Sequence, residues 1–123
     1  HDPYTHGTDK TSHGQWFYFR SSNAQAKACT YKIVNAGKAS FPDAWPGYQV
    51  VYSYDPAAPK PSWLRIPNTQ YTKEEVLQWS HTSEQENVWF AYFAPYSYQR
   101  HQRLVGRMGA APLARTSVIG QSL

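Results

Sequence analysis

Few residues in this chain could take part in catalysis or bind a metal, and they are widely separated. His6 and His13 each precede a glycine in a polar amino-terminal stretch, and their spacing matches no common zinc pattern, in which Cys or His residues form close pairs. We therefore interpret them as loop histidines. An amino-terminal histidine can hold copper through its own amine, which would require His1 to be the mature end of the protein.

Cys29 is the single cysteine, so no disulfide can form within the chain. A nucleophilic cysteine needs a neighbouring base and an electropositive pocket, and the sequence locates neither. Cys29 instead lies two and four residues before Tyr31 and Ile33 in a stretch of alternating apolar and polar residues, so the three side chains should lie on the same face of a strand. We predict that it is a small core residue.

The acidic and basic clusters also have structural explanations. A general acid–base pair must converge across a pocket, and four glutamates fall in two separate turns, so we interpret them as solvated surface. These are Glu74, Glu75, Glu84 and Glu86. A second cluster is basic and falls on one side of an expected helix, where it complements the helix dipole without a ligand. It contains Arg100, His101, Arg103 and Arg107.

Composition limits the class of protein. A chain of 123 residues forms one domain at most, with room for a piece of another, and 41% hydrophobic and 16% aromatic residues supply a core. The net charge of +4 is compatible with an acidic partner, but the basic residues do not form the continuous stripe that is typical of nucleic-acid-binding proteins. No apolar run approaches the roughly 18 residues of a membrane span, and no signal peptide opens the chain. We therefore expect a soluble, cytoplasmic protein.

Short β-forming runs separated by turn signals must position these residues. The densest run, Val88 to Ala94, precedes Pro95, which we expect to end the strand because proline has no N–H to donate. Lys73 to Glu75 could start a helix, but the segment up to His81 fits a strand better. The pattern predicts an all-β antiparallel sandwich, with strands at 15–20, 29–35, 49–54, 63–66, 74–81 and 88–94.

A short helix is expected after the last strand. Ser97 can cap its amino end, the helix runs to about Met108, and Gly109 is a plausible stop. Residues 110–115 read as a linker, and residues 116–123 start as another strand.

The aromatic residues of the long connection 35–48 allow two interpretations. Phe41, Trp45 and Tyr48 either pin the loop to the domain or form a stacking platform for a flat ligand. Pinning is favoured, since a loop of this length must be held to stay ordered. The alternative is a stand-alone module that binds carbohydrate or an acidic polypeptide, with Trp63 joining the platform.

Several blocks, in one order from Gln15 to Leu123, resemble the amino-terminal domain of cytosolic carboxypeptidase-like zinc metallopeptidases, and the bacterial branch in particular. Ile119-Gly120-Gln121-Ser122 is similar to the opening of the catalytic domain that follows it in that family. The family carries further strands before the first block, which residues 1–14 do not resemble. The blocks of the sandwich are Gln15-Trp16-Phe17-Tyr18-Phe19-Arg20, Ile33-Val34-Asn35, Ser40-Phe41-Pro42 with Trp45, Gly47 and Tyr48, Ser53-Tyr54-Asp55, and Phe90 to Tyr98.

The resemblance implies a β-sandwich packed against an α/β catalytic domain that holds one zinc through a His-x-x-Glu motif and a later histidine. His81-Thr82-Ser83-Glu84 fits that bare motif, but it precedes the strand that closes the sandwich, whereas the family's motif follows it. We therefore assign no catalytic and no metal residue in this chain. The resemblance places zinc in the catalytic domain, with a protein carboxy terminus as substrate, and implies no nucleic acid or membrane partner.

The expected organisation is a polar stretch at 1–14, a sandwich at 15–98, and at 99–123 a helix and linker leading toward the catalytic domain. By this resemblance the segment is not itself an enzyme. It supports folding and shapes the rim of the cleft of an enzyme that removes carboxy-terminal residues, including glutamate. The residues expected at the domain interface or substrate rim are Phe93, Pro95, Tyr96, Tyr98, Arg100 and Arg103.

Overall fold

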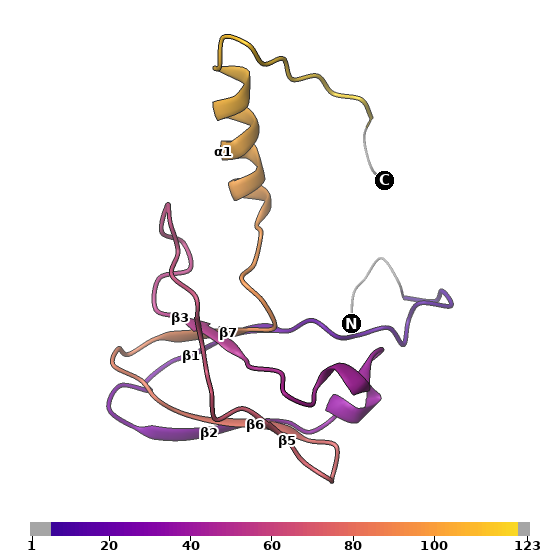
Figure 1. Ribbon diagram of the computed structural model, residues 1–123, viewed down its shortest axis with the longest axis vertical. Helices are drawn as coiled ribbons and strands as arrows, with labels where there is room; N and C mark the ends of the chain where they lie inside the picture. The colour runs from indigo at the N-terminus through magenta and orange to yellow at the C-terminus, as the bar shows by residue number, and fades with distance from the viewer. Residues whose placement is uncertain (1–5, 121–123) are drawn as a thin grey trace.

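A computed structural model describes residues 6–120, which fold into two facing antiparallel sheets followed by a helix (Figure 1). The predicted all-β sandwich is confirmed. The larger sheet has the order β1 (Tyr18–Ser21), β7 (Val88–Ala91), β3 (Val51–Ser53) and β4 (Leu64–Arg65). The smaller sheet has the order β2 (Ala28–Ile33), β6 (Leu77–Thr82) and β5 (Gln70–Tyr71).

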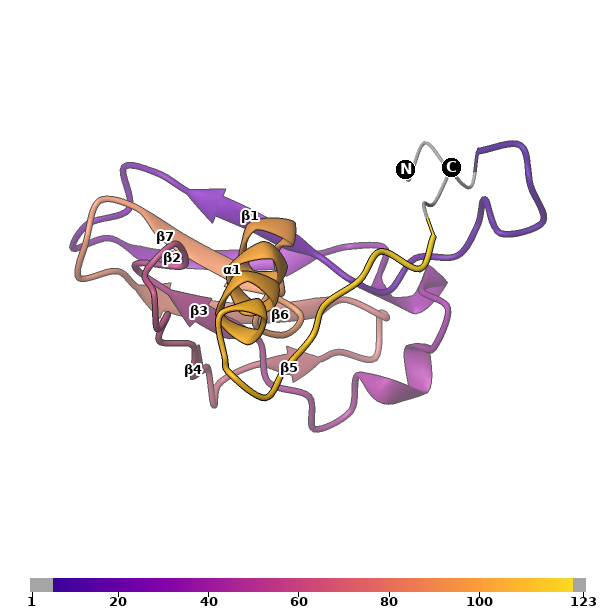
Figure 2. The same ribbon diagram turned by 90° about the horizontal axis from the view of Figure 1, so that it is seen from above.

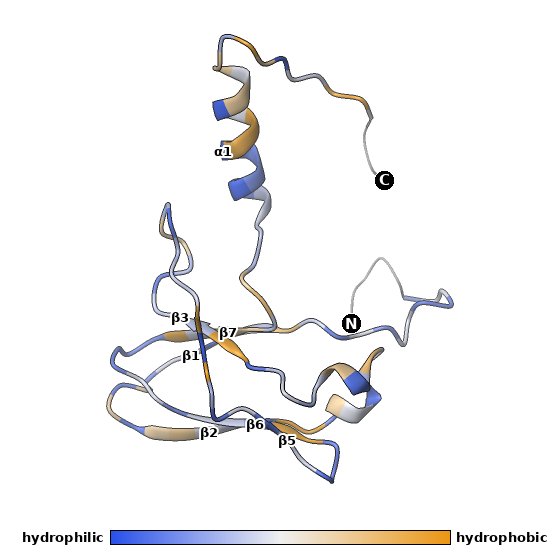
Figure 3. Ribbon diagram, in the orientation of Figure 1, coloured by the Kyte–Doolittle hydropathy of each residue, from blue (hydrophilic) through white to orange (hydrophobic). Residues whose placement is uncertain are grey.

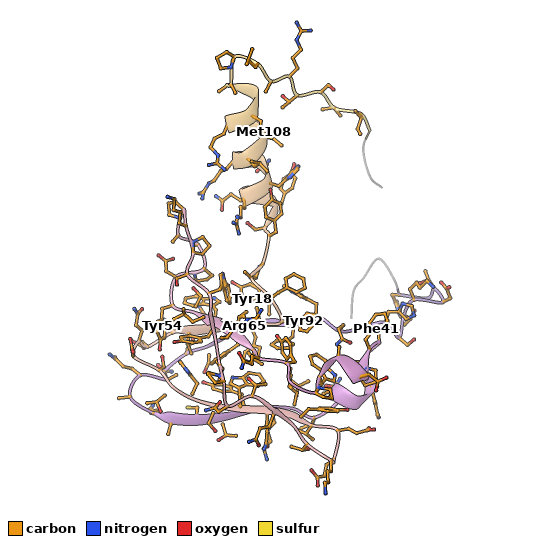
Figure 4. All side chains as sticks on the ribbon, in the orientation of Figure 1. Tyr18, Phe41, Tyr54, Arg65, Tyr92 and Met108 are labelled. Atoms are coloured by element: carbon orange, nitrogen blue, oxygen red, sulfur yellow. The ribbon has the colours of Figure 1, made fainter. Side chains whose placement is uncertain are left out.

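Aromatic rings fill the space between the sheets, as the side chains in Figure 4 show. Trp79 of β6 is buried and its ring lies 5.6 Å from Tyr31 of β2, 6.0 Å from Phe17 and 5.5 Å from Phe90 of β7. Each such ring buries a large apolar area, so a chain with few aliphatic residues can still form a core. Cys29 lies on the face of β2 that carries Tyr31, as predicted, but it is only half-buried and is not part of the core cluster.

The loop 35–48 is pinned to the sandwich. It contains two short 3₁₀ helices, η1 (Ala36–Lys38) and η2 (Pro42–Ala44). Trp45 is only 2% exposed, and its indole Nε1 donates a hydrogen bond of 2.9 Å to the carbonyl of Ala36. The Tyr48 hydroxyl donates to the carbonyl of Tyr92 just after β7. The pinning interpretation is confirmed, and a stacking platform that includes Trp45 is wrong because its ring is buried.

The strand β7 ends at Ala91, so the prediction that it continues to Pro95 is wrong. Ala91 pairs with Tyr18 on one side and with Val51 on the other, and neither neighbouring strand extends farther along β7. Before β1 the chain turns away to the loop 35–48, where the Gln15 side chain accepts from the backbone N–H of Phe41. The expected start of the first strand at Gln15 is therefore also wrong. Sheet neighbours, and not the proline, set both ends.

The remaining strands follow the prediction in type but not in every boundary. β6 confirms the choice of strand over helix, and it begins at Leu77 because a turn closed by Glu75 N–H on the Thr72 carbonyl occupies the start of the expected run. β5 has two residues and pairs with β6 across that turn. The sequence analysis missed β5, because two residues are too few to show the alternation of apolar and polar side chains that identifies a strand.

The helix α1 (Tyr98–Gly109) stands away from the sandwich (Figures 1 and 2). Its amino end is capped as predicted, since the Ser97 hydroxyl accepts a bond of 3.2 Å from the backbone N–H of Arg100. Ala110 is the carboxy-terminal cap, one residue after the expected stop. The expected strand from Thr116 is absent up to Gly120, where no sheet pairing is found, and residues 121–123 lie outside the described range. Within residues 6–120, no helix has the length and apolar character needed to cross a membrane.

Candidate functional site

The outer face of the larger sheet, on the side of α1, carries a row of aromatic rings. The ring of Tyr18 lies 5.9 Å from Trp16 and 6.2 Å from Trp63, and Trp16 lies 6.3 Å from Phe93. Trp16 is 49% exposed and Phe93 is 55% exposed. Alternation along β1 explains this row, because Phe17 and Phe19 point into the core while the residues beside them point outward. The sheet therefore has a second apolar face.

The segment after β7 leads from this face to α1. Tyr92 is held by its backbone N–H, which donates 3.0 Å to the Phe17 carbonyl, and by its ring, 4.9 Å from that of Tyr48. Beyond it, Tyr96 is 53% exposed, and the guanidinium of Arg100 lies 5.4 Å from the centre of the Tyr96 ring. This distance is typical of a cation–π contact. The chain that leaves the sandwich is therefore held in place at Tyr92, and large aromatic side chains after Tyr92 are exposed to solvent.

A groove of about 790 Å³ separates α1 from the proline-rich loop 55–62. The helix contributes Arg100, Arg103 and Arg107, which face the loop because positions three and four apart share one side of a helix. Tyr18 and Trp63 contribute aromatic surface, and Pro95 borders the groove where the chain leaves the sandwich. The opposite wall is formed by the loop residues Pro56, Ala57, Ala58, Pro59, Lys60 and Pro61.

The structure brings together only some of the six residues predicted for the interface or rim. Pro95, Arg100 and Arg103 line the groove, and Tyr96 contacts Arg100. Phe93 instead joins the aromatic row, and Tyr98 is 75% exposed and does not line the groove.

Sequence reasoning did not place Tyr18, Trp63 or the loop 56–61 at this site, although they line the groove. It did place Arg107 with Arg100 and Arg103 on one basic side of the helix. No pattern could have shown that the loop lies opposite it, because that is a tertiary relation.

His81, the one candidate with a metal-like spacing, is part of the fold. Its Nε2 lies 3.1 Å from the Tyr54 hydroxyl, and its ring lies 4.4 Å from that of Tyr52. The backbone N–H of Glu84 donates 2.9 Å to the same Tyr54 hydroxyl. Burial lowers the pKa of His81, although the Glu84 carboxylate opposes that change. The residues described contain no cluster of three or more metal-ligating side chains, so they do not fit a zinc ion.

A family model described as the cytosolic carboxypeptidase N-terminal domain matches residues 2–93, which include the whole sandwich. The chain belongs to this family. An uncharacterized protein of Zymomonas mobilis is 34% identical over 109 residues, which are 89% of this chain and 27% of that protein.

Solved structures agree with this assignment. A metallo-carboxypeptidase from Burkholderia cenocepacia superposes on this chain with a TM-score of 0.74 and is 33% identical to it. The match covers 82% of this chain and 25% of the Burkholderia protein. A second structure is a metallo-carboxypeptidase from Pseudomonas aeruginosa in complex with (2-guanidinoethylmercapto)succinic acid. It superposes with a TM-score of 0.70 at 42% identity, and the match covers 78% of this chain and 24% of the Pseudomonas protein. The chain thus spans about a quarter of the length of the relatives it matches.

Proposed function

We propose that this chain is the non-catalytic amino-terminal part of a zinc metallocarboxypeptidase that removes carboxy-terminal residues, including glutamate. The sandwich would support folding of the catalytic domain and shape the rim of its cleft. One observation carries this proposal: the chain matches the family over its whole sandwich yet spans only about a quarter of the metallo-carboxypeptidases it resembles. The other three quarters of such a protein would hold the zinc and the reacting groups.

The proposed contact surface runs from the aromatic row to the start of α1. It contains Phe93, Pro95, Tyr96, Tyr98, Arg100 and Arg103. Its support is exposure, because a short stretch of chain presents several large apolar side chains to solvent, which on a soluble protein marks an interaction site. The helix α1 contains a hydrophobic stretch (Figure 3), and Leu104, Val105 and Met108 in it are exposed.

The family description also supports a proposed location and partners. We place the parent enzyme in the cytoplasm, with a peptide or protein carboxy terminus as its substrate and with no nucleic acid or membrane partner. The zinc belongs to the proposed catalytic domain, since residues 6–120 do not fit it. In that domain zinc would activate the attacking water.

The first test is the intact mass of the native polypeptide. A mass well above 14.1 kDa means that the chain continues, and zinc content and release of carboxy-terminal amino acids from peptides are then measured. A mass of 14.1 kDa would overturn the proposal for this molecule. So would a longer polypeptide that contains no zinc and releases no amino acid.

Replacing Tyr96 by alanine tests the contact surface. Tyr96→Ala removes the ring beside Arg100, and we expect lower carboxypeptidase activity or lower yield of the native polypeptide, by roughly tenfold, with its zinc content unchanged. Tyr96→Phe keeps the ring and should behave like the natural protein. Unchanged yield and kinetics in Tyr96→Ala would show that this residue is not at the interface.

A further inference from the structure

The two outer edges of the smaller sheet differ in how they are covered. On one side, the Asn68 side chain takes the place of a strand partner, since its Nδ2 donates 3.0 Å to the Ser80 carbonyl and its Oδ1 accepts 3.3 Å from the Ser80 N–H. Together with β5 it covers most of that side of β6. On the other side β2 runs for six residues, and no strand of the described chain lies beside its outer edge. An uncovered edge of this length is a template for another strand.

The pairing with β6 determines which backbone groups of β2 point outward. In an antiparallel strand, the backbone N–H and C=O groups of successive residues point alternately to the neighbours on the two sides. Because Ser80 turns its groups toward Asn68, the next residue, His81, turns its own toward Cys29 of β2. Every second residue of β2 therefore turns its N–H and C=O away from β6, and within residues 6–120 these groups have no hydrogen-bond partner. These residues are Ala28, Thr30 and Lys32.

The residues of this edge are complementary to a second copy of the same strand. In an antiparallel pair centred on Thr30, the two Thr30 residues lie opposite each other, and Ala28 of each copy lies opposite Lys32 of the other. This register pairs all the outward N–H and C=O groups. Threonine pairs across strands are favourable. Lys32 is the one charged residue of β2, and the two lysines lie roughly 14 Å apart in this register, so they repel each other weakly.

We propose that two copies of this protein pair through β2 and form one continuous sheet, with Thr30 at the two-fold axis. A second copy is favoured over an unrelated strand because the register uses every outward group and brings no like charges together. β2 lies in the sheet farther from α1 (Figure 1), so a catalytic domain on the side of α1 leaves this edge accessible. The contact area is small, so the dimer is weak and depends on concentration. The pairing does not rest on the proposed enzymatic role.

Charge substitutions at the exposed Ala28 test the pairing, and sedimentation equilibrium of the full native polypeptide measures the dimer dissociation constant. Ala28→Lys places a second ammonium group opposite Lys32 of the other copy, twice in each dimer, so we expect the constant to rise about fivefold. Ala28→Glu places a carboxylate there, and the constant should fall about threefold. Gln70→Lys is the matched control. It adds the same charge to the opposite edge of the sheet, and the constant should change less than about twofold.

A disulfide crosslink tests the register. Cys29→Ser first removes the single native cysteine. In that background Thr30→Cys puts thiols on two directly opposite residues, whose Cα atoms are about 5.5 Å apart in such a pair and within reach of a disulfide. Lys32→Cys puts them roughly 14 Å apart, which is too far. After mild oxidation we expect a covalent dimer of the Thr30→Cys protein on a non-reducing gel, and a monomer of the Lys32→Cys protein.

Three results would overturn the proposal: a full native polypeptide that stays monomeric at roughly 1 mM, equal effects of Ala28→Lys and Gln70→Lys, or equal crosslinking of the two cysteine variants. The first result, together with a dimer of the 123-residue chain, would show that another part of the same polypeptide covers β2. These results are separate from those of the activity test. A β2 dimer without carboxypeptidase activity would remove only the proposed enzymatic role, and an active monomer would remove only the dimer.

Discussion

At the edge of the sandwich, His81 of β6 lies against Tyr52 and Tyr54 from the other sheet. The Tyr54 hydroxyl oxygen also accepts from the backbone N–H of Glu84. The bond between Tyr54 and Nε2 of His81 runs in the direction that the histidine tautomer sets. Burial at this contact favours the neutral imidazole, so the charge of His81 affects the stability of this edge.

We predict that the fold loses stability at mildly acidic pH through His81. Its pKa in the folded chain lies below the ordinary value of 6.5, chiefly because of burial, and the Glu84 carboxylate opposes this only in part. A lowered pKa means that the folded chain prefers the neutral form, so this contribution is complete above 6.5 and is lost as the pH falls below it. Urea unfolding at about pH 5 and about pH 7.5 measures the difference. His81→Gln should reduce it, and an unchanged difference would show that other groups are responsible.

Trp45 provides a second prediction at this scale. Trp45→Ala leaves a large cavity and removes the indole bond to the Ala36 carbonyl, which keeps its bond from the Ala39 N–H, so we expect it to lower the free energy of unfolding by about 3–5 kcal/mol. Phe41→Ala, in the same loop but at a side chain 69% exposed, should change it by less than about 0.5 kcal/mol. Chemical denaturation of both variants makes the comparison. Similar losses would mean that the loop is not pinned through Trp45.

Among the elements, α1 differs from the strands because it belongs to neither sheet, and none of its residues is buried or packs against the aromatic core. The strands are held by two sheets and a shared aromatic core, whereas the helix has 12 residues and its own caps. Isolated helices of this length are marginal in water. The stability of α1 in this chain must therefore depend strongly on local interactions, above all on the cap at Ser97.

We predict that Ser97→Ala reduces the helix content of this chain and leaves the sandwich intact. The loss of one cap costs about 1 kcal/mol, which is large for a marginal helix. Far-ultraviolet circular dichroism reports the helix, and the near-ultraviolet signal of the aromatic core reports the sandwich. Ser97→Asp keeps a capping oxygen and should retain the helix. A parallel loss of both signals in Ser97→Ala would contradict the idea that α1 is independent of the sandwich.

For the molecule as a whole, apolar surface remains in contact with solvent on two neighbouring parts. One is the aromatic row over the larger sheet, and the other is the side of α1 that carries Leu104, Val105 and Met108, which are 37%, 37% and 49% exposed. Tyr18 of the aromatic row and Met108 of the helix both lie on the side of the sandwich from which α1 rises (Figure 4). This distribution agrees with the proposal that a catalytic domain covers this side.

Met108 allows that proposal to be tested by oxidation. It is the single methionine of the sequence, and in this chain nearly half of its surface is exposed. In the full native polypeptide we expect peroxide to oxidise Met108 at least about tenfold more slowly than in the 123-residue chain, because the catalytic domain would cover it. Peptide mass mapping gives both rates. Equal rates would show that this side of α1 stays exposed.

Much of the architecture could be predicted from local patterns. The alternation in β2, the dense aromatic run of β7 and the serine before α1 each act over a few residues, so their outcomes follow from backbone geometry and side-chain size. The class of fold and the face of β2 on which Cys29 lies were predicted correctly for this reason, whereas its place in the core was not. The family blocks, which depend on residue identity and order, led to the family that the comparisons show.

Strand ends, the short strand β5, and the groove follow from contacts between distant residues. β7 ends where Tyr18 and Val51 stop pairing with it. Trp45 is buried against Tyr48 and Tyr92, and the Ala36 carbonyl accepts the bond of its buried indole N–H. The row of arginines is visible in the sequence, but its position opposite Pro56 to Pro61 depends on the path of the chain through both sheets. Such contacts join segments far apart in sequence, and their energies depend on the packing around them, so local patterns of residue type do not reveal which segments will meet.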